Sequence, residues 1–254
     1  MGKLDFFDSN CMVGPRKLMY PGSFYTPEDL IVRMENYGIG RALTRHAYAC
    51  ELDAADGNER LMTDIAALKE LTPMWVVMPH HTHEFKAPVD LRADLKKNGI
   101  RAVAILSDVA HFGFSLAEWN SGALLSMLEE CRIPVFVSMS CFDASFRELH
   151  DLLKAHPQLP VVLTEISYRV SRNIFPLMRL FPNLHLESYG YKAQDGIEEL
   201  CREFGADRVV FGSGMPDASG AAAVAMITYA NITDEEKALI ASGNLDRLMG
   251  GVRI

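Results

Sequence analysis

Short apolar runs rich in β-branched residues recur along the whole chain, and polar or turn-forming residues bound each of them. Runs of this length and composition are typical of strands that are buried on both faces of a parallel sheet. The pattern predicts eight strands, at residues 4–8, 42–48, 74–78, 102–106, 134–139, 161–166, 184–187 and 208–212.

Helical patterns lie between these runs. The stretch from Leu91 ends at Asn98-Gly99, a common helix stop, and Thr233 with Glu236 forms a capping-box pattern at the start of the last helix. Strands separated by helices require parallel crossover connections. Eight such units in 254 residues predict a single domain over residues 1–254, an α/β fold of the (β/α)₈ or TIM-barrel type. An open doubly wound sheet is the alternative, but no glycine-rich phosphate-binding motif follows the first strand.

Composition narrows the class of protein and of partner. The formal net charge is −8, with 49% hydrophobic and 23% charged residues, which excludes disorder and argues against nucleic acid or a membrane surface as partner. No apolar run is long enough to span a bilayer. The chain turns acidic at Asp5, unlike a secretion signal, and its five cysteines have no C-x-x-C spacing. We therefore expect a cytoplasmic protein with free thiols.

In a barrel of this type, chemistry takes place where the strands end. The segment from Pro79 to Phe85 follows the third run and contains His81 and His83, which face the same way if the chain stays extended. Histidine suits general acid–base chemistry, contact with a substrate or metal binding, and a polar loop without function is the remaining alternative. His111 follows the fourth run, and it either positions a substrate or is a half-buried structural residue.

Charged residues end three further runs. Arg45 and His46 are adjacent, so one points into the barrel, where it would bind an anionic group or pair with a neighbouring acid. Glu165 and Glu187 would form a pair with separated pKa values, or neutralise a cation. We predict catalytic roles for His81, His111, Glu165 and Glu187, and substrate contacts for Arg45, His46, His83, Ser140, Tyr189 and Asp217.

The chain resembles the amidohydrolase-related family of (β/α)₈ enzymes. The resemblance rests on Phe204–Ser213 with Met215-Pro216, on Ile232–Lys237, and on Gly243–Leu248; Phe7–Gly14 is similar to the family's first strand. It implies hydrolysis or non-oxidative decarboxylation of a small molecule, with a divalent metal such as zinc as the usual cofactor.

The metal ligands of that family do not recur. The family usually has His-x-His on the first strand, a histidine on the fifth, often one on the sixth, and an aspartate on the eighth. The corresponding residues here are Asn10 and Met12, Ser138 or Ser140, Glu165, and Gly214. An amide and a thioether are poor ligands for zinc or manganese, and glycine has no side chain that could coordinate a metal. We therefore expect no bound metal.

Three hypotheses about function follow. The first is a metal-independent hydrolase or decarboxylase acting on a small polar metabolite. The second is an inactive barrel that binds a small ligand or a protein partner. The third is a metal enzyme with a relocated site at His81 and His83. A homodimer is compatible with each, although the sequence reveals no interface.

Overall fold

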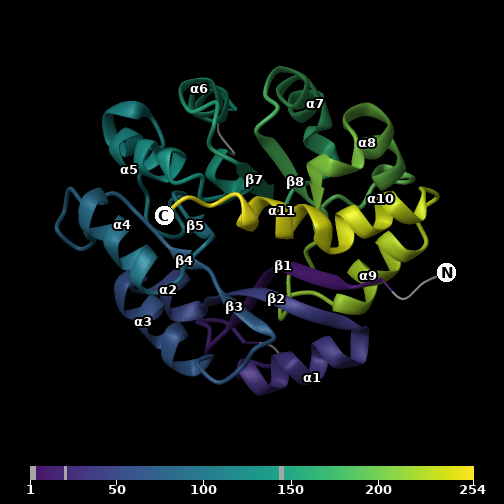
Figure 1. Cartoon of the computed structure of the whole chain (residues 1–254), viewed down its shortest axis with the longest axis horizontal. Coiled ribbons are helices and arrows are strands. Elements are labelled where there is room, and N and C mark those ends of the chain that lie inside the picture. Colours follow the sequence, from purple (N-terminus) through teal and green to yellow (C-terminus); the bar gives the residue numbers. More distant parts are fainter. Residues whose placement is uncertain (1–3, 20–21, 143–145) are drawn as a thin grey trace.

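The structure is a computed structural model that describes residues 4–19, 22–142 and 146–254. Its strands form a ring, and helices surround the ring (Figure 1). The strands are β1 (Phe6–Val13), β2 (Ile39–His46), β3 (Leu71–Pro73), β4 (Trp75–Val76), β5 (Val103–Ile105), β6 (Val135–Ser138), β7 (Val161–Thr164), β8 (Leu184–Glu187) and β9 (Val209–Val210). The helices are α1 (Pro27–Tyr37), α2 (Ala47–Glu51), α3 (Ala54–Asp64), α4 (Pro88–Lys97), α5 (Glu118–Glu130), α6 (Arg147–Ala155), α7 (Ser171–Leu180), α8 (Gly196–Phe204), α9 (Gly220–Thr228), α10 (Asp234–Ala238) and α11 (Asn244–Gly250). In the described ranges, no helix is both long enough and apolar enough to cross a membrane.

Parallel pairing runs through β1–β2–β3 and through β4 to β9, and backbone hydrogen bonds join these two sheets. β3 and β4 are parts of one barrel strand, because the intervening Met74 N donates to Thr44 O on β2 at 2.9 Å. At the other junction, Ser9 N donates to Phe211 O at 3.0 Å, just beyond β9. The result is a closed ring of eight strands, so the predicted (β/α)₈ barrel is confirmed.

The first two strands differ from the prediction at both ends. The first strand was expected to end at Asp8, but it continues to Val13, with an irregular register between Asp8 and Cys11. The polar residues in this stretch misled the prediction, because they are buried in the barrel instead of lying in a loop. The second strand ends at His46, which is the N-cap of α2.

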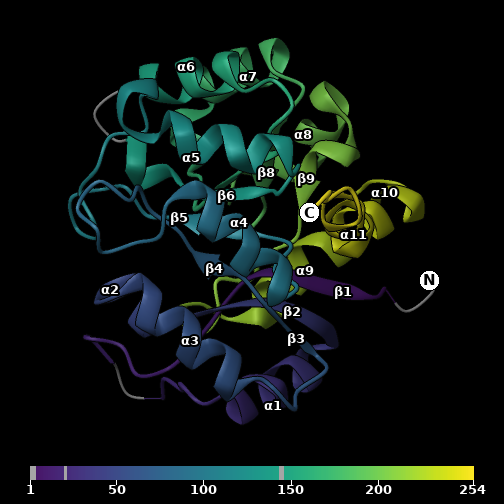
Figure 2. The same ribbon diagram turned by 60° about the vertical axis from the view of Figure 1, so that its left-hand side comes forward.

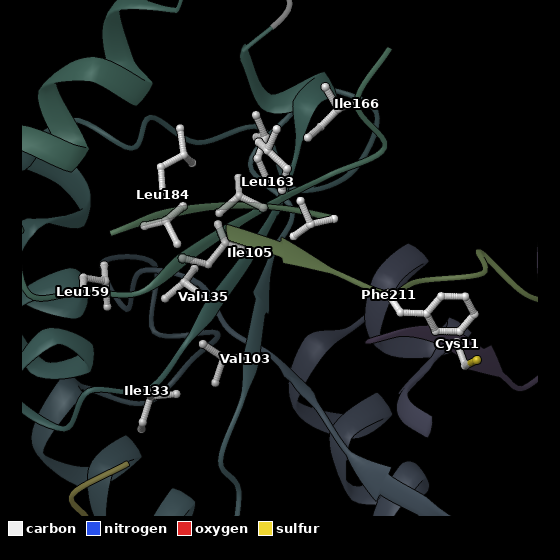
Figure 3. Close-up of a cluster of buried hydrophobic side chains, with 14 of the residues drawn as sticks. Cys11, Val103, Ile105, Ile133, Val135, Leu159, Leu163, Ile166, Leu184 and Phe211 are labelled. Carbon is white, nitrogen blue, oxygen red and sulfur yellow. The ribbon is translucent and has the colours of Figure 1, made fainter. Parts of the chain in front are cut away.

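Side chains along the strands alternate between two apolar clusters. Val103 and Ile105 of β5 belong to the cluster that packs beneath the surrounding helices (Figure 3), whereas Ala104 belongs to the inner cluster with Phe136 and Val162. This alternation is the two-residue period expected of a strand buried on both faces. It explains why these strands appear in the sequence as continuous apolar runs.

Helix α11 closes the amino-terminal end of the barrel. Its Leu245 and Leu248 pack in the inner cluster, and Asn244 Nδ2 donates to Val209 O at 2.7 Å. Figure 1 shows this helix crossing the centre of the ring. The preceding helix α10 begins with the predicted capping box of Thr233 and Glu236. The opposite end, where the strands end, is where ligands have access.

Candidate functional site

A cavity of about 470 Å³ lies at the carboxyl end of the strands. The residues around it come from every part of the ring, as is usual for barrel enzymes. Five of the predicted site residues line it: Arg45, His111, Glu165, Tyr189 and Asp217. We call this the mouth cavity.

The first side of the mouth cavity is built on β1, β2 and β8. Arg45 Nη2 donates to Asn10 Oδ1 at 2.6 Å, and Asn10 Nδ2 donates to Glu187 Oε2 at 3.3 Å. Glu187 is fully buried below Asn10, which lines the cavity. Glu187 therefore supports the wall from behind, while Arg45 presents its charge to the cavity. Arg45 Nε is a buried donor with no partner.

Burial controls the protonation of this side. Desolvation by burial, with smaller contributions from the charges of Asp8 and Glu165, raises the pKa of Glu187 to about 8, so the carboxyl group holds its proton at neutral pH. Burial also raises the pKa of Asp8, although Asp8 Oδ1 accepts hydrogen bonds from the backbone N–H groups of Asn10 and Ser213. One oxygen of each of these carboxyl groups, Asp8 Oδ2 and Glu187 Oε1, is buried and has no hydrogen-bond partner.

Glycine makes room for Glu187. A Cβ atom at Gly212 would lie 1.8 Å from Glu187 Oε1, which is closer than any atoms pack. The structure thus gives a reason for glycine at position 212, the close approach of a carboxyl group.

The second side of the mouth cavity is built beyond β5 and β6. His111 Nδ1 lies 2.9 Å from both carboxylate oxygens of Asp108. Only an N–H donor satisfies two acceptors, so the neutral ring carries its proton on Nδ1 and leaves Nε2 as a base. Although burial opposes it, the hydrogen bond and charge of His111, with further bonds from Ala110 and Ser140, hold the pKa of Asp108 below its ordinary value.

Two serines connect the sides. Ser138 Oγ donates to Glu165 Oε2 at 2.7 Å, and Ser140 Oγ donates to Asp108 Oδ2 at 3.2 Å. With both hydroxyl protons used in this way, the link between the serines is the Ser140 N–H, which donates to Ser138 Oγ at 3.2 Å. Glu165 N donates to Glu187 Oε2 at 3.3 Å. Hydrogen bonds to side-chain and backbone groups of Ser140, Ser138 and Glu165 thus connect Asp108 with Glu187.

Glu165 has an unusual backbone conformation. Its φ is +60°, in the left-handed region that non-glycine residues seldom adopt. The chain of β8 approaches closely here, since a Cβ atom at Gly190 would lie 2.7 Å from the carbonyl carbon of Glu165. Strained backbone of this kind clusters at functional sites, because surrounding contacts must hold it in place.

The rim of the mouth cavity carries compensated charges. Asp217 forms an ion pair with Arg16, and Lys192 Nζ lies 5.0 Å from the centre of the Tyr189 ring. The same ring covers Gly214, where a Cβ atom would lie 2.7 Å from it. The Tyr189 ring therefore occupies the space that a side chain at position 214 would need.

His46 points away from the cavity, as alternation with Arg45 requires. Its Nδ1 accepts a hydrogen bond from Tyr48 N at 3.0 Å, and its Nε2 lies 3.3 Å from Asp64 Oδ2. Burial lowers its pKa despite the nearby carboxylate of Asp64. Of the two alternatives at this strand end, the structure places Arg45 in the cavity and gives His46 a capping role at α2.

The segment after β4 is not extended, so the condition under which His81 and His83 would face the same way is not met. The chain turns, with His83 N donating to His80 O at 3.0 Å and His83 at a φ of +65°. His81 Nε2 lies 2.8 Å from Asn120 O, outside the mouth cavity, and His83 lines a different cavity. In the part of the chain that the structure describes, no group of three His, Cys, Asp or Glu residues is placed to hold a metal.

Four residues of the mouth cavity region were not predicted as site residues: Asn10, Asp108, Ser138 and Lys192. Asp108 had a detectable signal, because it precedes His111 by three residues in a segment expected at the mouth. Asn10 and Ser138 were considered only as replaced metal ligands. Nothing in the sequence distinguishes Lys192 from a surface lysine.

Comparison with known proteins gives a consistent result. The model of the Amidohydrolase family matches residues 10–250. No curated protein sequence matches the chain.

Three solved structures illustrate the likeness in fold. An uncharacterized TIM-barrel protein from Bordetella bronchiseptica is 17% identical, with a TM-score of 0.76 over 98% of this chain and 99% of that one. A dihydroxybenzoic acid decarboxylase from Polaromonas sp. with bound manganese is 14% identical, with a TM-score of 0.73 over 97% of each chain. A Pseudomonas putida protein described as a 2-pyrone-4,6-dicarboxylic acid hydrolase is 17% identical, with a TM-score of 0.69 over 98% of each chain.

Proposed function

The chain belongs to the Amidohydrolase family, and we propose that it hydrolyses or decarboxylates a small polar metabolite by acid–base chemistry that uses no bound divalent metal. The observation that carries this proposal is the series of hydrogen bonds from His111 to Asp108, from Ser140 Oγ to Asp108, from Ser140 N to Ser138 Oγ and from Ser138 Oγ to Glu165. It places an oriented base and a carboxylate on one cavity.

His111 is the proposed general base or acid. Asp108 fixes its orientation and its tautomer, so that Nε2 is available to take a proton from a substrate or from water. The ring lines the mouth cavity, and its side chain is 32% exposed, so a substrate can reach it. An imidazole held by a carboxylate is the arrangement by which many hydrolases keep a base in its productive orientation.

Glu165 is the proposed partner carboxylate, and Glu187 positions it. Glu165 lines the cavity, whereas Glu187 is buried behind it and accepts the Glu165 N–H. Arg45 is the proposed anchor for an anionic group on the substrate, since its positively charged side chain lines the mouth cavity. Ser140, Tyr189 and Asp217 remain proposed as substrate contacts or rim residues, while His81 and His83 have no part in this mechanism.

The residues at the family's metal positions do not suit a divalent cation. Asn10 Oδ1 already accepts a hydrogen bond from the Arg45 guanidinium, a positive charge 2.6 Å away. Glu187, which is protonated at neutral pH because of burial, offers no negative charge. Position 214 cannot supply a carboxylate, because the Tyr189 ring fills its side-chain space. A structural relative holds manganese, but Glu165 is the one carboxylate among the residues at the family's metal positions here, and the Arg45 cation lies beside Asn10.

The metal proposal is tested on protein purified without added metal or a histidine tag. Elemental mass spectrometry is expected to find less than stoichiometric transition metal, and Zn²⁺ or Mn²⁺ is expected to leave the melting temperature unchanged. Stoichiometric metal would contradict the proposal. A rise in melting temperature on addition of metal would also contradict it if the rise is no larger in Arg45→Met, which lacks the competing positive charge, than in the unchanged protein.

Activity is tested with a panel of small carboxylic acids, lactones and amides, by following carbon dioxide release and hydrolysis after chelator treatment. A turnover that survives the chelator and is lost in His111→Ala supports the proposed enzyme. A ligand that binds in the mouth cavity of both the unchanged protein and His111→Ala, and that neither protein converts, would instead support an inactive, ligand-binding barrel.

A further inference from the structure

A small pocket lies next to the mouth cavity, between helix α9 and the chain beyond β8. Its volume is about 140 Å³, and Tyr189 and Lys192 line both this pocket and the mouth cavity. Helix α9 follows the last strand of the ring and lies beside β1, where the ring closes (Figure 2). We call this space the side pocket. A ligand in the mouth cavity has only to pass these two side chains to reach it.

The wall of the side pocket is apolar. Most of it comes from α9 and the turn before it, through Ala218, Ala222, Ala223 and Met226. Ser213 also lines the pocket, but its hydroxyl oxygen is used within the protein, where it accepts from the backbone N–H of residue 215 at 3.1 Å. An apolar wall of this kind favours a hydrocarbon group.

Helix α9 has an unusual composition for a helix on the outside of a barrel. Apart from Thr228, it consists of glycine, alanine, valine, methionine and isoleucine, although residues 221 and 222 are exposed. A surface helix normally carries polar or charged residues on its exposed face. The apolar face of α9 is explained if part of it serves as the wall of a binding pocket.

Lys192 is the one charged residue among the described residues that line the side pocket. Its Nζ lies 5.0 Å from the centre of the Tyr189 ring, and no carboxylate of the described ranges pairs with it. Arg45 in the mouth cavity likewise forms no ion pair there, whereas Asp217 is paired with Arg16. An apolar wall with a cation at its edge favours an anionic group joined to a hydrocarbon group, and disfavours a cationic ligand.

The volume limits the size of the hydrocarbon group. An apolar cavity of about 150 Å³ holds one benzene molecule. The side pocket, at about 140 Å³, therefore takes about six carbons at most. Each methylene group that moves from water into such a wall raises the affinity by about three- to fourfold. A flexible chain passes Tyr189 and Lys192 more readily than a rigid ring.

We propose that the mouth cavity and the side pocket together bind a small aliphatic carboxylate, with the carboxylate in the mouth cavity and the hydrocarbon chain in the side pocket against Ala222 and Met226. This names the substrate class of the proposed function, and it rests on that proposal only for the anion anchor at Arg45. Binding without conversion satisfies it equally.

The test uses sodium hexanoate as the probe and sodium acetate as the short reference, on protein whose methionine methyl groups carry ¹³C. Met12 and Met215 line the mouth cavity, Met226 lines the side pocket, and single Met→Leu variants assign their signals. Hexanoate is expected to move all three signals, and acetate only those of Met12 and Met215. Met62, which lines the separate cavity that contains His83, is the control and should not move.

The methionine signals distinguish failure of this inference from failure of the anion anchor. If hexanoate moves Met12 and Met215 but leaves Met226 in place, the side pocket is overturned and the anchor stands. If neither probe moves Met12 or Met215, the anchor is overturned and this proposal with it. Equal shifts of Met62 and Met226 would show unspecific binding to apolar surface and would also overturn the proposal.

A matched pair of variants locates the hydrocarbon chain. Ala222→Leu fills the side pocket, whereas Ala221→Leu is the control, because Ala221 is exposed on the same helix and lines neither space. In titration calorimetry, hexanoate is expected to bind about 10-fold or more tightly than acetate, a ratio that Ala221→Leu keeps and Ala222→Leu lowers to about 3 or less. Arg45→Met is expected to weaken both probes alike. A ratio that Ala222→Leu leaves unchanged overturns the proposal.

Discussion

Glu187 on β8 and Asp108 beyond β5 are both carboxyl groups at the mouth of the barrel, yet their surroundings move their pKa values in opposite directions. Glu187 is fully buried, and the groups near it are other carboxyls and an amide, so burial dominates and the proton stays on. Asp108 is near the surface, and a histidine and a serine donate to it. The comparison teaches that partners, more than the residue type, decide the charge of a carboxyl in this site.

The largest expected effect concerns the Asp108 side. If His111 is the acid–base group, His111→Ala lowers kcat by about 100- to 10,000-fold once a substrate is known. His81→Ala is the matched control, because His81 is also an exposed histidine beyond a barrel strand but bonds to Asn120 O outside the cavity. Equal losses in both variants would show that the difference between these two histidines has no catalytic meaning.

The second expected effect is that the free energy of unfolding depends on pH because of Glu187. Glu187 keeps its proton up to a pH of about 8 when folded, compared with 4.5 for the free side chain. The folded state therefore binds more protons over this interval, and its free energy of unfolding falls as the pH rises through it, by up to about 1.4 kcal/mol per pH unit.

Urea unfolding between pH 5 and pH 8 measures that slope. Glu187→Gln is expected to remove the fall due to Glu187, leaving a weaker fall from Asp8, whose pKa is also raised by burial, and below about pH 6.5 the opposite slope of His185, whose pKa burial lowers to about 4. The exposed Glu130→Gln is the control and should leave the slope as it is. Asp108 contributes nothing in this interval, because its lowered pKa makes its stabilisation fade only when the pH falls below its ordinary value of 3.8. A slope unchanged by Glu187→Gln would contradict the burial argument.

The third effect tests the space that glycine leaves for Glu187. Gly212→Ala is expected to lower the free energy of unfolding by about 1–3 kcal/mol, because the new Cβ atom would overlap Glu187 Oε1. Gly250→Ala is the control, since a Cβ atom there meets nothing within 4 Å. In the double variant Gly212→Ala with Glu187→Ala, most of the loss due to the glycine substitution should disappear. Additive losses would mean that the overlap is not with Glu187.

The sequence was sufficient to predict the barrel, because its strands are buried on both faces and therefore appear as uniform apolar runs. It failed where polar residues are buried: Asp8, Ser9 and Asn10 look like a loop but belong to β1. At Pro79–Phe85 it left an extended segment and a loop open, and the structure shows a turn there.

For the site, residues that follow strands could be nominated, and five of them line the mouth cavity. Which nominated residue reaches the cavity depends on long-range contacts that no local pattern encodes. His111 and His81 have similar sequence surroundings, and only the distances to Asp108 and Asn120 separate them. In the same way, nothing local distinguishes the buried Glu187 from the exposed Glu165.

The smallest expected effect tests whether the two sides of the mouth are connected. Ser140 Oγ donates to Asp108, so Ser140→Ala removes this one hydrogen bond, keeps the bond from the backbone N–H of residue 140 to Ser138, and is expected to lower the free energy of unfolding by about 1 kcal/mol. Ser126→Ala, at an exposed position of α5, is the control and should be neutral or slightly stabilising, because alanine favours helix.

The informative measurement is a double-variant cycle of Ser140→Ala with Glu165→Gln, read from unfolding free energies. Glu165 accepts from Ser138, which is the other neighbour of Ser140 in the chain. If the serines couple the side-chain state of Glu165 to that of Asp108, the two losses in unfolding free energy will not add. The coupling energy will then be a few tenths of a kcal/mol or more. Strictly additive losses would mean that the Asp108 side and the Glu187 side are neighbours with independent energetics, and that His111 must work without help from Glu165.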